Sequence, residues 1–203
     1  MHLDGMKIYP EYFDRDAQVG LIDVLRRLVV SCPFYTPEMP RSGKPMSVRM
    51  TNFGSLGWVT DRSGYRYQQT HPKTGEHWAG MPDELNRLWR DLSGYPHLPE
   101  SCLANYYTGK ARMGLHQDAD EKDRNAPIVS VSLGDTAVFR IGGSSRKDPT
   151  KSFKLRSGDV LVMGGQARMR FHGVDRIVPD TSTLLSGGGR LNLTLRRVNL
   201  PES

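Results

Sequence analysis

The chain has 203 residues, of which 37% are hydrophobic, and a formal charge of +6 at pH 7. This length suits one hydrophobic core, and no stretch approaches the roughly eighteen consecutive apolar residues of a membrane span. We therefore expect a single cytoplasmic domain, residues 1–203, without membrane segments or an apolar signal peptide. Two cysteines, Cys32 and Cys102, are too few for a disulfide framework. The excess of basic residues favours a polyanionic partner, although an ordinary solvated surface can carry the same charge.

The first half of the chain contains two predicted helices separated by an irregular segment. Residues 14–31 form an amphipathic pattern in which Asp14 can cap the first turn, and Pro33 is expected to end the helix. A second helix is expected over residues 82–93, with a proline at its start and a glycine after its end. Residues 35–81 are rich in Pro, Gly and Tyr, which predicts loops and short hairpins laid over another part of the fold.

From Cys102 onward the pattern changes to short alternating runs separated by turn residues, which is typical of a β-sandwich or barrel. The predicted strands are 102–108, 127–133, 136–141, 152–156, 159–163, 168–172 and 190–198. The fold class is therefore mainly β with flanking helices (α+β). A small jelly roll with the helices packed outside it fits this pattern best.

A first group of candidate functional residues has the spacing of a metal site. His116 and Asp118 are two residues apart, and His172 follows about fifty residues later, which suits Fe(II) bound by two histidines and one carboxylate. Residues two apart in an extended chain point the same way, so the first pair can bind one metal from one strand end. The pair alone is a weak signal, because about 0.3 such matches per chain arise by chance.

A second group lies on the last predicted strand, which reads RLNLTLR and alternates between polar and apolar residues. Arg190, Asn192 and Arg196 therefore share one face, where burial is unfavourable unless an anion pairs with the guanidinium groups. A dicarboxylate would satisfy both arginines. A solvent-facing edge strand would show the same pattern. Only the combination with the metal motif favours an anion-binding face over such an edge strand. Asn105 and Tyr107 share one side of the earlier strand and are placed to complete such a cradle.

Several motifs occur in a fixed order between residues 101 and 196, namely NYYTG, LHQDADE, APIVSVSLG, FRIGG, SGDV, FHG and RLNLTLR. In these motifs the sequence resembles the bacterial AlkB family, whose members are dioxygenases dependent on Fe(II) and 2-oxoglutarate. The resemblance runs, with short interruptions, from about Met50 to Val198, and the shared order of the motifs makes it highly specific.

The resemblance implies a double-stranded β-helix, which is a jelly roll, with an N-terminal nucleotide-recognition lid. Residues 1–100 would supply the helices and the lid, and residues 101–203 the dioxygenase core. Iron would be held by His116, Asp118 and His172. The cosubstrate 2-oxoglutarate would chelate the metal, and O2 would be the other reactant.

The resemblance also assigns the strand residues to the cosubstrate. Arg190 would pair with the distal carboxylate of 2-oxoglutarate, supported by Tyr107. Arg196 would hold the carboxylate nearer the metal, with Asn105 and Asn192 beside it. The argument from alternation places the same residues on one face without reference to any family.

On the substrate side, Trp58 and Tyr65 match the aromatic residues with which the family contacts a base, and Asp120 matches a carboxylate. Arg146 matches a further substrate-side residue, and Met50 is expected to form an apolar wall. A base methylated at a ring nitrogen is cationic, so aromatic faces and a carboxylate select it over the neutral parent. Ordinary packing of a loop onto the barrel would also explain the two aromatic residues.

Two positions depart from the family pattern. Met163 stands where the better-known bacterial relative has a tryptophan, and Asp61 replaces a histidine in the lid. Both departures put the shape of the base pocket and the preference for strand type in doubt. Neither affects a predicted metal or cosubstrate residue.

The expected function is oxidative demethylation of bases such as 1-methyladenine and 3-methylcytosine in DNA, with release of formaldehyde, succinate and CO2. This would be direct-reversal DNA repair by a monomer. One alternative keeps the chemistry but acts on RNA, such as a tRNA base, or on a protein side chain. The other is a basic nucleic-acid-binding module without catalysis, in which His116 and His172 bind no metal.

Overall fold

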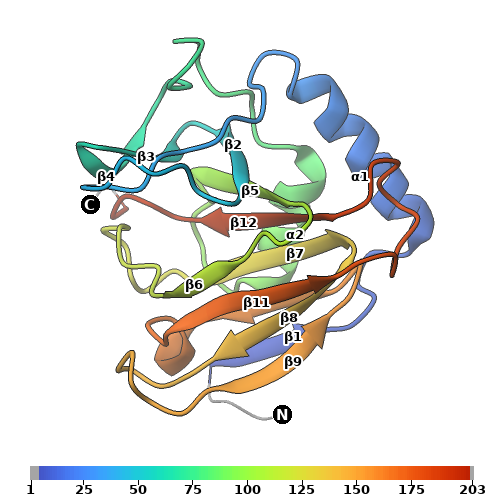
Figure 1. Cartoon of the computed structure of the whole chain (residues 1–203), viewed down its shortest axis with the longest axis vertical. Helices are drawn as coiled ribbons and strands as arrows, with labels where there is room; N and C mark the ends of the chain where they lie inside the picture. The colour runs from blue at the N-terminus through green and yellow to red at the C-terminus, as the bar shows by residue number, and fades with distance from the viewer. Residues whose placement is uncertain (1–4, 202–203) are drawn as a thin grey trace.

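The computed structural model describes residues 5–201, and its strands form two antiparallel sheets and a separate hairpin (Figure 1). The larger sheet has the order β1-β10-β7-β12-β5-β2, and the smaller has the order β6-β11-β8-β9. The elements are β1 (Met6–Tyr9), α1 (Arg15–Leu28), β2 (Arg49–Gly54), β3 (Gly57–Asp61), β4 (Gly64–Gln68), α2 (Asp83–Leu92), β5 (Ser101–Tyr107), β6 (Met113–His116), β7 (Ile128–Gly134), β8 (Thr136–Ile141), β9 (Lys151–Leu155), β10 (Val160–Met163), a 3-10 turn η1 (Gly165–Ala167), β11 (His172–Val178) and β12 (Arg190–Arg196). This mainly β jelly roll with flanking helices confirms the predicted fold class.

Helix α1 begins as predicted, because the Asp14 carboxylate accepts a hydrogen bond from the Ala17 amide at 2.9 Å. It ends at Leu28, three residues before the predicted boundary, so Pro33 is not what stops it. Beyond the helix the chain turns toward the core, where the Cys32 side chain is fully buried. Within the described part of the chain, neither helix is long and apolar enough to cross a membrane.

Both helices pack on one face of the larger sheet, away from the smaller sheet. Leu25 of α1 and Leu88 and Trp89 of α2 belong to one buried cluster with Leu193 of β12. Helix α2 begins directly after Pro82, as its sequence predicts, since a proline in this position loses no helical hydrogen bond. The apolar stripes of the two helices therefore cover the outer face of the sheet.

Strand β12 has two chemically different faces, as its alternation predicts. Leu191, Leu193 and Leu195 lie in the cluster that contacts the helices. The opposite face of the larger sheet meets a second buried cluster, which includes Tyr107 of β5 and residues of β8 and β11 in the smaller sheet. The polar residues of β12 consequently point into the space between the two sheets.

The predicted strand at 168–172 is wrong. The turn η1 is followed by a bend, and β11 begins only at His172. The polar residue Arg168, which the strand prediction placed at the start of the run, is buried in a turn. Its Nε donates to the Ala126 carbonyl at 3.0 Å. The segment 35–81 does contain a hairpin, β3–β4, but it also supplies β2, which pairs with β5 and widens the larger sheet.

Truncation of a leucine in the centre of β12 tests whether this strand anchors the helix side of the core. We expect Leu193→Ala to lower the free energy of unfolding by about 2–5 kcal/mol, because Leu193 is fully buried and its loss leaves a cavity. Leu200→Ala is the control, since Leu200 is 59% exposed and its change stays within about 0.5 kcal/mol. Urea denaturation measures both, and equal effects would contradict this packing.

Candidate active site

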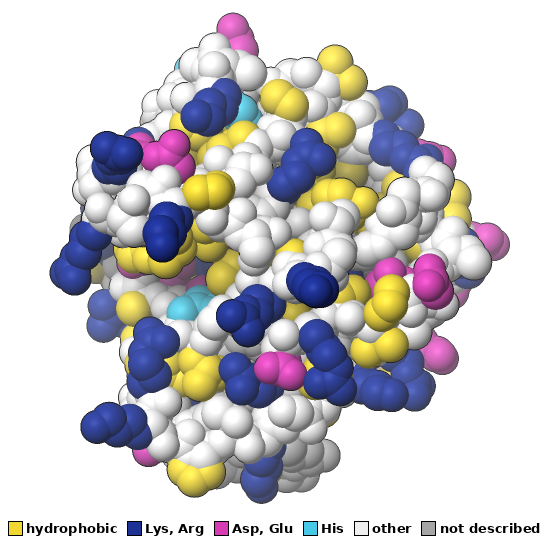
Figure 2. All heavy atoms as spheres, in the orientation of Figure 1, with side chains coloured by type: hydrophobic (Ala, Val, Ile, Leu, Met, Phe, Trp, Pro, Cys, Tyr) yellow, Lys and Arg dark blue, Asp and Glu magenta, His cyan; other side chains and the backbone are white. Residues whose placement is uncertain are grey.

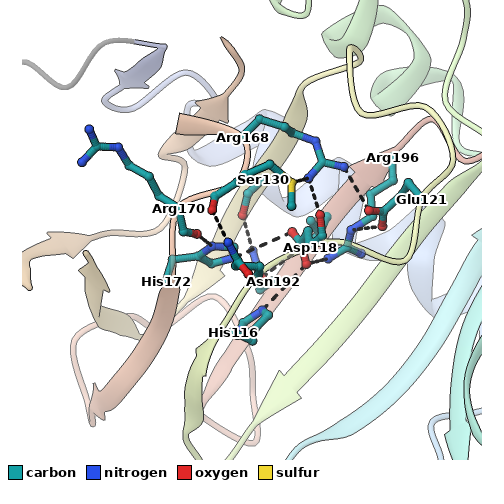
Figure 3. A network of polar contacts seen from close by, with 12 residues as sticks. His116, Asp118, Glu121, Ser130, Arg168, Arg170, His172, Asn192 and Arg196 are labelled. Atoms are coloured by element: carbon teal, nitrogen blue, oxygen red, sulfur yellow. Dashed lines mark hydrogen bonds and ion pairs between the residues drawn. The ribbon is translucent and has the colours of Figure 1, made fainter. Parts of the chain in front are cut away.

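The three predicted metal ligands lie together between the sheets (Figure 3). His116 is the last residue of β6, and it is the direct partner of His172 in the pairing of β6 with β11. Asp118 follows two residues after β6. One ligand atom from each side chain lies within 4.8 Å of the other two. The pairing of two strands distant in sequence thus brings the HxD motif next to the second histidine.

Backbone carbonyls orient both histidine rings. His116 Nδ1 is 2.9 Å from the Gly114 carbonyl oxygen, and His172 Nδ1 is 3.0 Å from that of Arg170. A carbonyl can only accept, so each Nδ1 carries a proton, which in a neutral imidazole leaves the lone pair on Nε2. The Nε2 atoms lie 3.8 and 3.7 Å from the Asp118 carboxylate oxygens. The free donors of all three residues therefore converge on one point.

The electrostatics of the cluster suit a bound cation. Burial alone would raise the pKa of the Asp118 carboxyl, but the Arg196 guanidinium and then the two histidines outweigh it and hold that pKa below its ordinary value. Burial, with the nearby His116, lowers the pKa of His172 to about 4. Asp118 Oδ2 is buried without a hydrogen-bond partner among the described residues. Two imidazoles and a carboxylate are a donor set that fits Fe(II).

Arg190 is a buried cation with unused donors. Its side chain is 1% exposed, and Nη2 donates to Ser132 Oγ at 2.9 Å. Nε and Nη1 have no hydrogen-bond partner within residues 5–201, and burial lowers the pKa of the guanidinium. The guanidinium carbon lies 5.4 Å from the centre of the Tyr107 ring, which comes from the facing position of β5. Such an arrangement needs an anion.

Arg196 lies on the same face of β12, six residues further along the strand. Its Nη2 donates to Asp118 Oδ1 at 3.0 Å, whereas Nε and Nη1 have no hydrogen-bond partner among the residues described. Between the two arginines, Asn192 stands opposite Asn105 and donates to Ser130 Oγ at 2.7 Å. Asn105 Oδ1 is also buried and unpaired in the described structure. We call Asn105, Tyr107, Arg190, Asn192 and Arg196 the cosubstrate seat, since the donors left over there fit the carboxylates of 2-oxoglutarate.

The β3–β4 hairpin brings the two predicted base-contacting aromatic residues next to the metal site. The rings of Trp58 and Tyr65 stack, with their centres 5.4 Å apart and an angle of 21° between the planes. Trp58 Nε1 donates to Asp120 Oδ2 at 2.7 Å, and Asp120 lies two residues after the predicted metal ligand Asp118. Tyr65 is 51% exposed, so its ring is accessible from solvent.

The two remaining substrate-side predictions fall in different surroundings. Met50, on β2, is 1% exposed and stands opposite Asn105 in the strand register, so it borders the cosubstrate seat. Arg146 is exposed, donates from Nη1 to the Leu115 carbonyl and lies 5.0 Å above the Phe171 ring. Leu115 and Phe171 each precede one of the two predicted histidine ligands, so Arg146 spans the two strand ends that carry these histidines.

Two residues that the sequence analysis did not single out complete the site. Glu121 and Arg168 are almost fully buried and form an ion pair, with Arg168 Nη2 2.9 Å from Glu121 Oε2. Arg168 Nη1 also donates to the Asp118 backbone carbonyl. Arg168 lies in the segment 168–172, which was wrongly predicted to be a strand. Glu121 is the last residue of the DADE run, and the sequence does not show which acidic residues of this run are buried. No pattern of spacing marks either residue.

A jelly roll that places two histidines and one carboxylate beside buried arginines defines the class of non-haem Fe(II) oxygenases that use an oxo-acid cosubstrate. Residues 5–196 match the family model described as the 2OG-Fe(II) oxygenase superfamily. The chain belongs to this superfamily and, by the relatives described next, to its AlkB branch.

The chain is 53% identical to an alpha-ketoglutarate-dependent dioxygenase AlkB homolog of Caulobacter vibrioides, over 95% of this chain and 87% of the relative. It is 41% identical to the alpha-ketoglutarate-dependent dioxygenase AlkB of Escherichia coli, over 94% of this chain and 89% of that protein. The solved structure of OsALKBH1 superimposes with a TM-score of 0.84 at 32% identity, covering 97% of this chain and 99% of its own.

Removal of the buried cation beside Glu121 tests whether the ion pair supports the site. We expect Arg168→Met to lower the free energy of unfolding by about 3 kcal/mol, because a buried carboxylate then loses its best partner. The matched control is Arg87→Met, since Arg87 is 64% exposed and lies 3.6 Å from Glu84, and its loss costs less than about 1 kcal/mol. Thermal or urea unfolding compares them, and similar losses would argue against a supporting role.

Proposed function

We propose that this chain repairs nucleic acid by oxidative removal of alkyl groups from bases, with 1-methyladenine and 3-methylcytosine in DNA as substrates. The products are formaldehyde, succinate, CO2 and the restored base. The observation that carries the proposal is the metal-ligand cluster lying beside two buried guanidinium groups with unused donors. Membership of the AlkB branch supplies the reaction class.

In this proposal His116, Asp118 and His172 hold Fe(II), which leaves room at the metal for 2-oxoglutarate and O2. The bound iron couples decarboxylation of 2-oxoglutarate to hydroxylation of the N-methyl carbon. The role of the protein is to position the reactants. The carbonyls of Gly114 and Arg170 keep the histidine rings turned toward the metal.

The cosubstrate seat binds 2-oxoglutarate through charge pairing. Arg190 pairs with the distal carboxylate, and the Tyr107 hydroxyl supports it. Arg196 holds the carboxylate nearer the metal, with Asn105 and Asn192 beside it. The burial of both arginines supports these roles, because a charge-assisted hydrogen bond is strongest where water is excluded.

On the substrate side, Trp58 and Tyr65 offer aromatic faces to a flipped base, and Asp120 offers a carboxylate. All three attract a base that carries a positive charge after methylation. Met50 forms the apolar floor of this pocket, and Arg146 lies at its edge. The hydrogen bond between Trp58 and Asp120 supports the assignment, because it holds an aromatic face and a carboxylate at the same entrance.

The partner is a nucleic acid in which the phosphate backbone contributes affinity. Lys and Arg side chains are spread over the face seen in Figure 2 and outnumber acidic ones there, in keeping with the net charge of +6. RNA remains an alternative substrate, because a 2'-hydroxyl changes none of the contacts assigned above.

We further propose that residues 1–203 act as one domain and as a monomer in the cytoplasm, since a base within a long polymer needs an open approach.

Formaldehyde release tests the chemistry. Anaerobic incubation with Fe(II), 2-oxoglutarate and a single-stranded oligonucleotide carrying 1-methyladenine, followed by air, should yield formaldehyde and the repaired base by mass spectrometry. His172→Ala should abolish release, whereas His77→Ala, at an exposed position, should not. Competition between DNA and RNA of the same sequence identifies the preferred strand. Absence of release from protein shown to contain iron would favour the non-catalytic binding module.

The role of Arg190 is tested by replacing its charge. We expect Arg190→Met to raise the KM for 2-oxoglutarate by about 100-fold or more, because the distal carboxylate loses a buried charged partner. Uptake of Co(II) should be unchanged, since Arg190 is no metal ligand. Arg176→Met, at an exposed position of β11, is the control. An unchanged KM for 2-oxoglutarate in the Arg190→Met variant would contradict a role of Arg190 in binding the cosubstrate.

A further inference from the structure

A buried carboxylate, Glu121, connects the β3–β4 hairpin with the cosubstrate seat. Its Oε1 lies 3.3 Å from Arg196 Nε and accepts a hydrogen bond of 2.5 Å from the Tyr67 hydroxyl. Its Oε2 is held by Arg168 at 2.9 Å. One carboxylate oxygen is therefore shared between a hydroxyl of the hairpin and an arginine of the seat. Figure 3 shows Glu121 joined to Arg168 and Arg196.

Tyr67 belongs to the same structural unit as the proposed base-contacting residues. It lies on β4 and is the direct cross-strand partner of Trp58 on β3. Burial raises the pKa of the Tyr67 hydroxyl well above its ordinary value, so the group stays protonated and donates. Any shift of the hairpin that moves Trp58 toward or away from a base also moves Tyr67.

The hairpin is tied twice to one short segment. Trp58 donates to Asp120 at 2.7 Å, and Tyr67 donates to the adjacent residue, Glu121. The segment also contains the metal ligand Asp118, whose carboxylate accepts from Arg196. Arg168 fixes the segment from its other side through the Asp118 carbonyl and the Glu121 carboxylate. The path from hairpin to seat consequently runs through a hydrogen bond from Tyr67 to Glu121 and an ion pair between Glu121 and Arg196 Nε, an atom that has no hydrogen-bond partner among the described residues.

We propose that Tyr67 and Glu121 are positioning residues that couple occupation of the base pocket to the affinity for 2-oxoglutarate. This inference rests on the proposed function. When the hairpin closes on a base, Tyr67 takes part of the charge of Glu121, and Arg196 directs its donors toward the diacid. When the hairpin is open, Glu121 holds Arg196 more strongly and the diacid binds more weakly. Neither residue needs to touch either reactant.

The coupling is measured without turnover. Protein loaded with Mn(II) under anaerobic conditions is titrated calorimetrically with 2-oxoglutarate, with and without a single-stranded oligonucleotide that carries 1-methyladenine. We expect the oligonucleotide to lower the Kd for 2-oxoglutarate by about fivefold or more in the parent protein. In Tyr67→Phe, which keeps the ring but loses the donor, the two Kd values should be equal. Linkage requires that 2-oxoglutarate tighten oligonucleotide binding by the same factor.

The matched control is Tyr95→Phe. Tyr95 donates to the buried carboxylate of Asp123 at 2.7 Å, two residues beyond Glu121, but it belongs to neither the hairpin nor the seat. It should keep the full coupling of the parent. In turnover with the methylated oligonucleotide, Tyr67→Phe should raise the KM for 2-oxoglutarate by the lost factor with little change in kcat. Melting temperature and Mn(II) affinity, measured on both variants, exclude a loss of folding as the cause.

The outcomes separate this inference from the proposed function. If the parent binds 2-oxoglutarate but the oligonucleotide leaves its Kd unchanged, or if Tyr67→Phe retains the coupling, the inference is overturned and the proposed function stands. If Tyr95→Phe loses the coupling equally, the loss comes from a general decrease in the rigidity of this region, and the inference is also overturned. If the Mn(II)-loaded parent binds no 2-oxoglutarate, the proposed function fails, and the inference fails with it.

Discussion

The central constraint in this molecule is positive charge buried between two sheets. Arg190 and Arg196 project from one strand into a space that excludes water, and an unpaired cation there is strongly unfavourable. The charge of Arg196 is balanced by the Asp118 and Glu121 carboxylates. Each of the two arginines keeps two donors without hydrogen-bond partners in the described structure. An anionic ligand satisfies this excess. The buried positive charge of Arg196 is also what lowers the pKa of the Asp118 carboxyl. The Asn105 and Asn192 amides add polar groups to the same space.

The jelly roll meets this constraint by giving each strand two distinct environments. The leucines of β12 pack against the helices, which supplies the burial that holds the strand in place, while its polar residues face inward. Pairing of β6 with β11 then sets the two histidines next to one another, close to Arg196. Stability and chemistry are thus divided between the two faces of the larger sheet.

The site and the hairpin above it form one connected system. Trp58 and Tyr67 each bond to the segment that carries Asp118, so the hairpin is not an independent flap. Glu121 and Arg168 make this connection possible, because they replace water inside the protein with fixed, paired charges. In the proposed coupling, these contacts let the presence of a base strengthen the binding of 2-oxoglutarate.

The sequence by itself determined the fold class and the face of β12 on which the arginines lie, and it predicted His116, Asp118 and His172 as metal ligands, because alternation and motif spacing are local properties of the chain. It also placed α1 and α2 within three residues, since capping and apolar stripes are local too. Only the tertiary structure decided that β2 joins the larger sheet, that 168–172 is no strand and that Glu121 and Arg168 pair. These features depend on contacts between distant segments, and a buried ion pair leaves no periodic trace in the sequence.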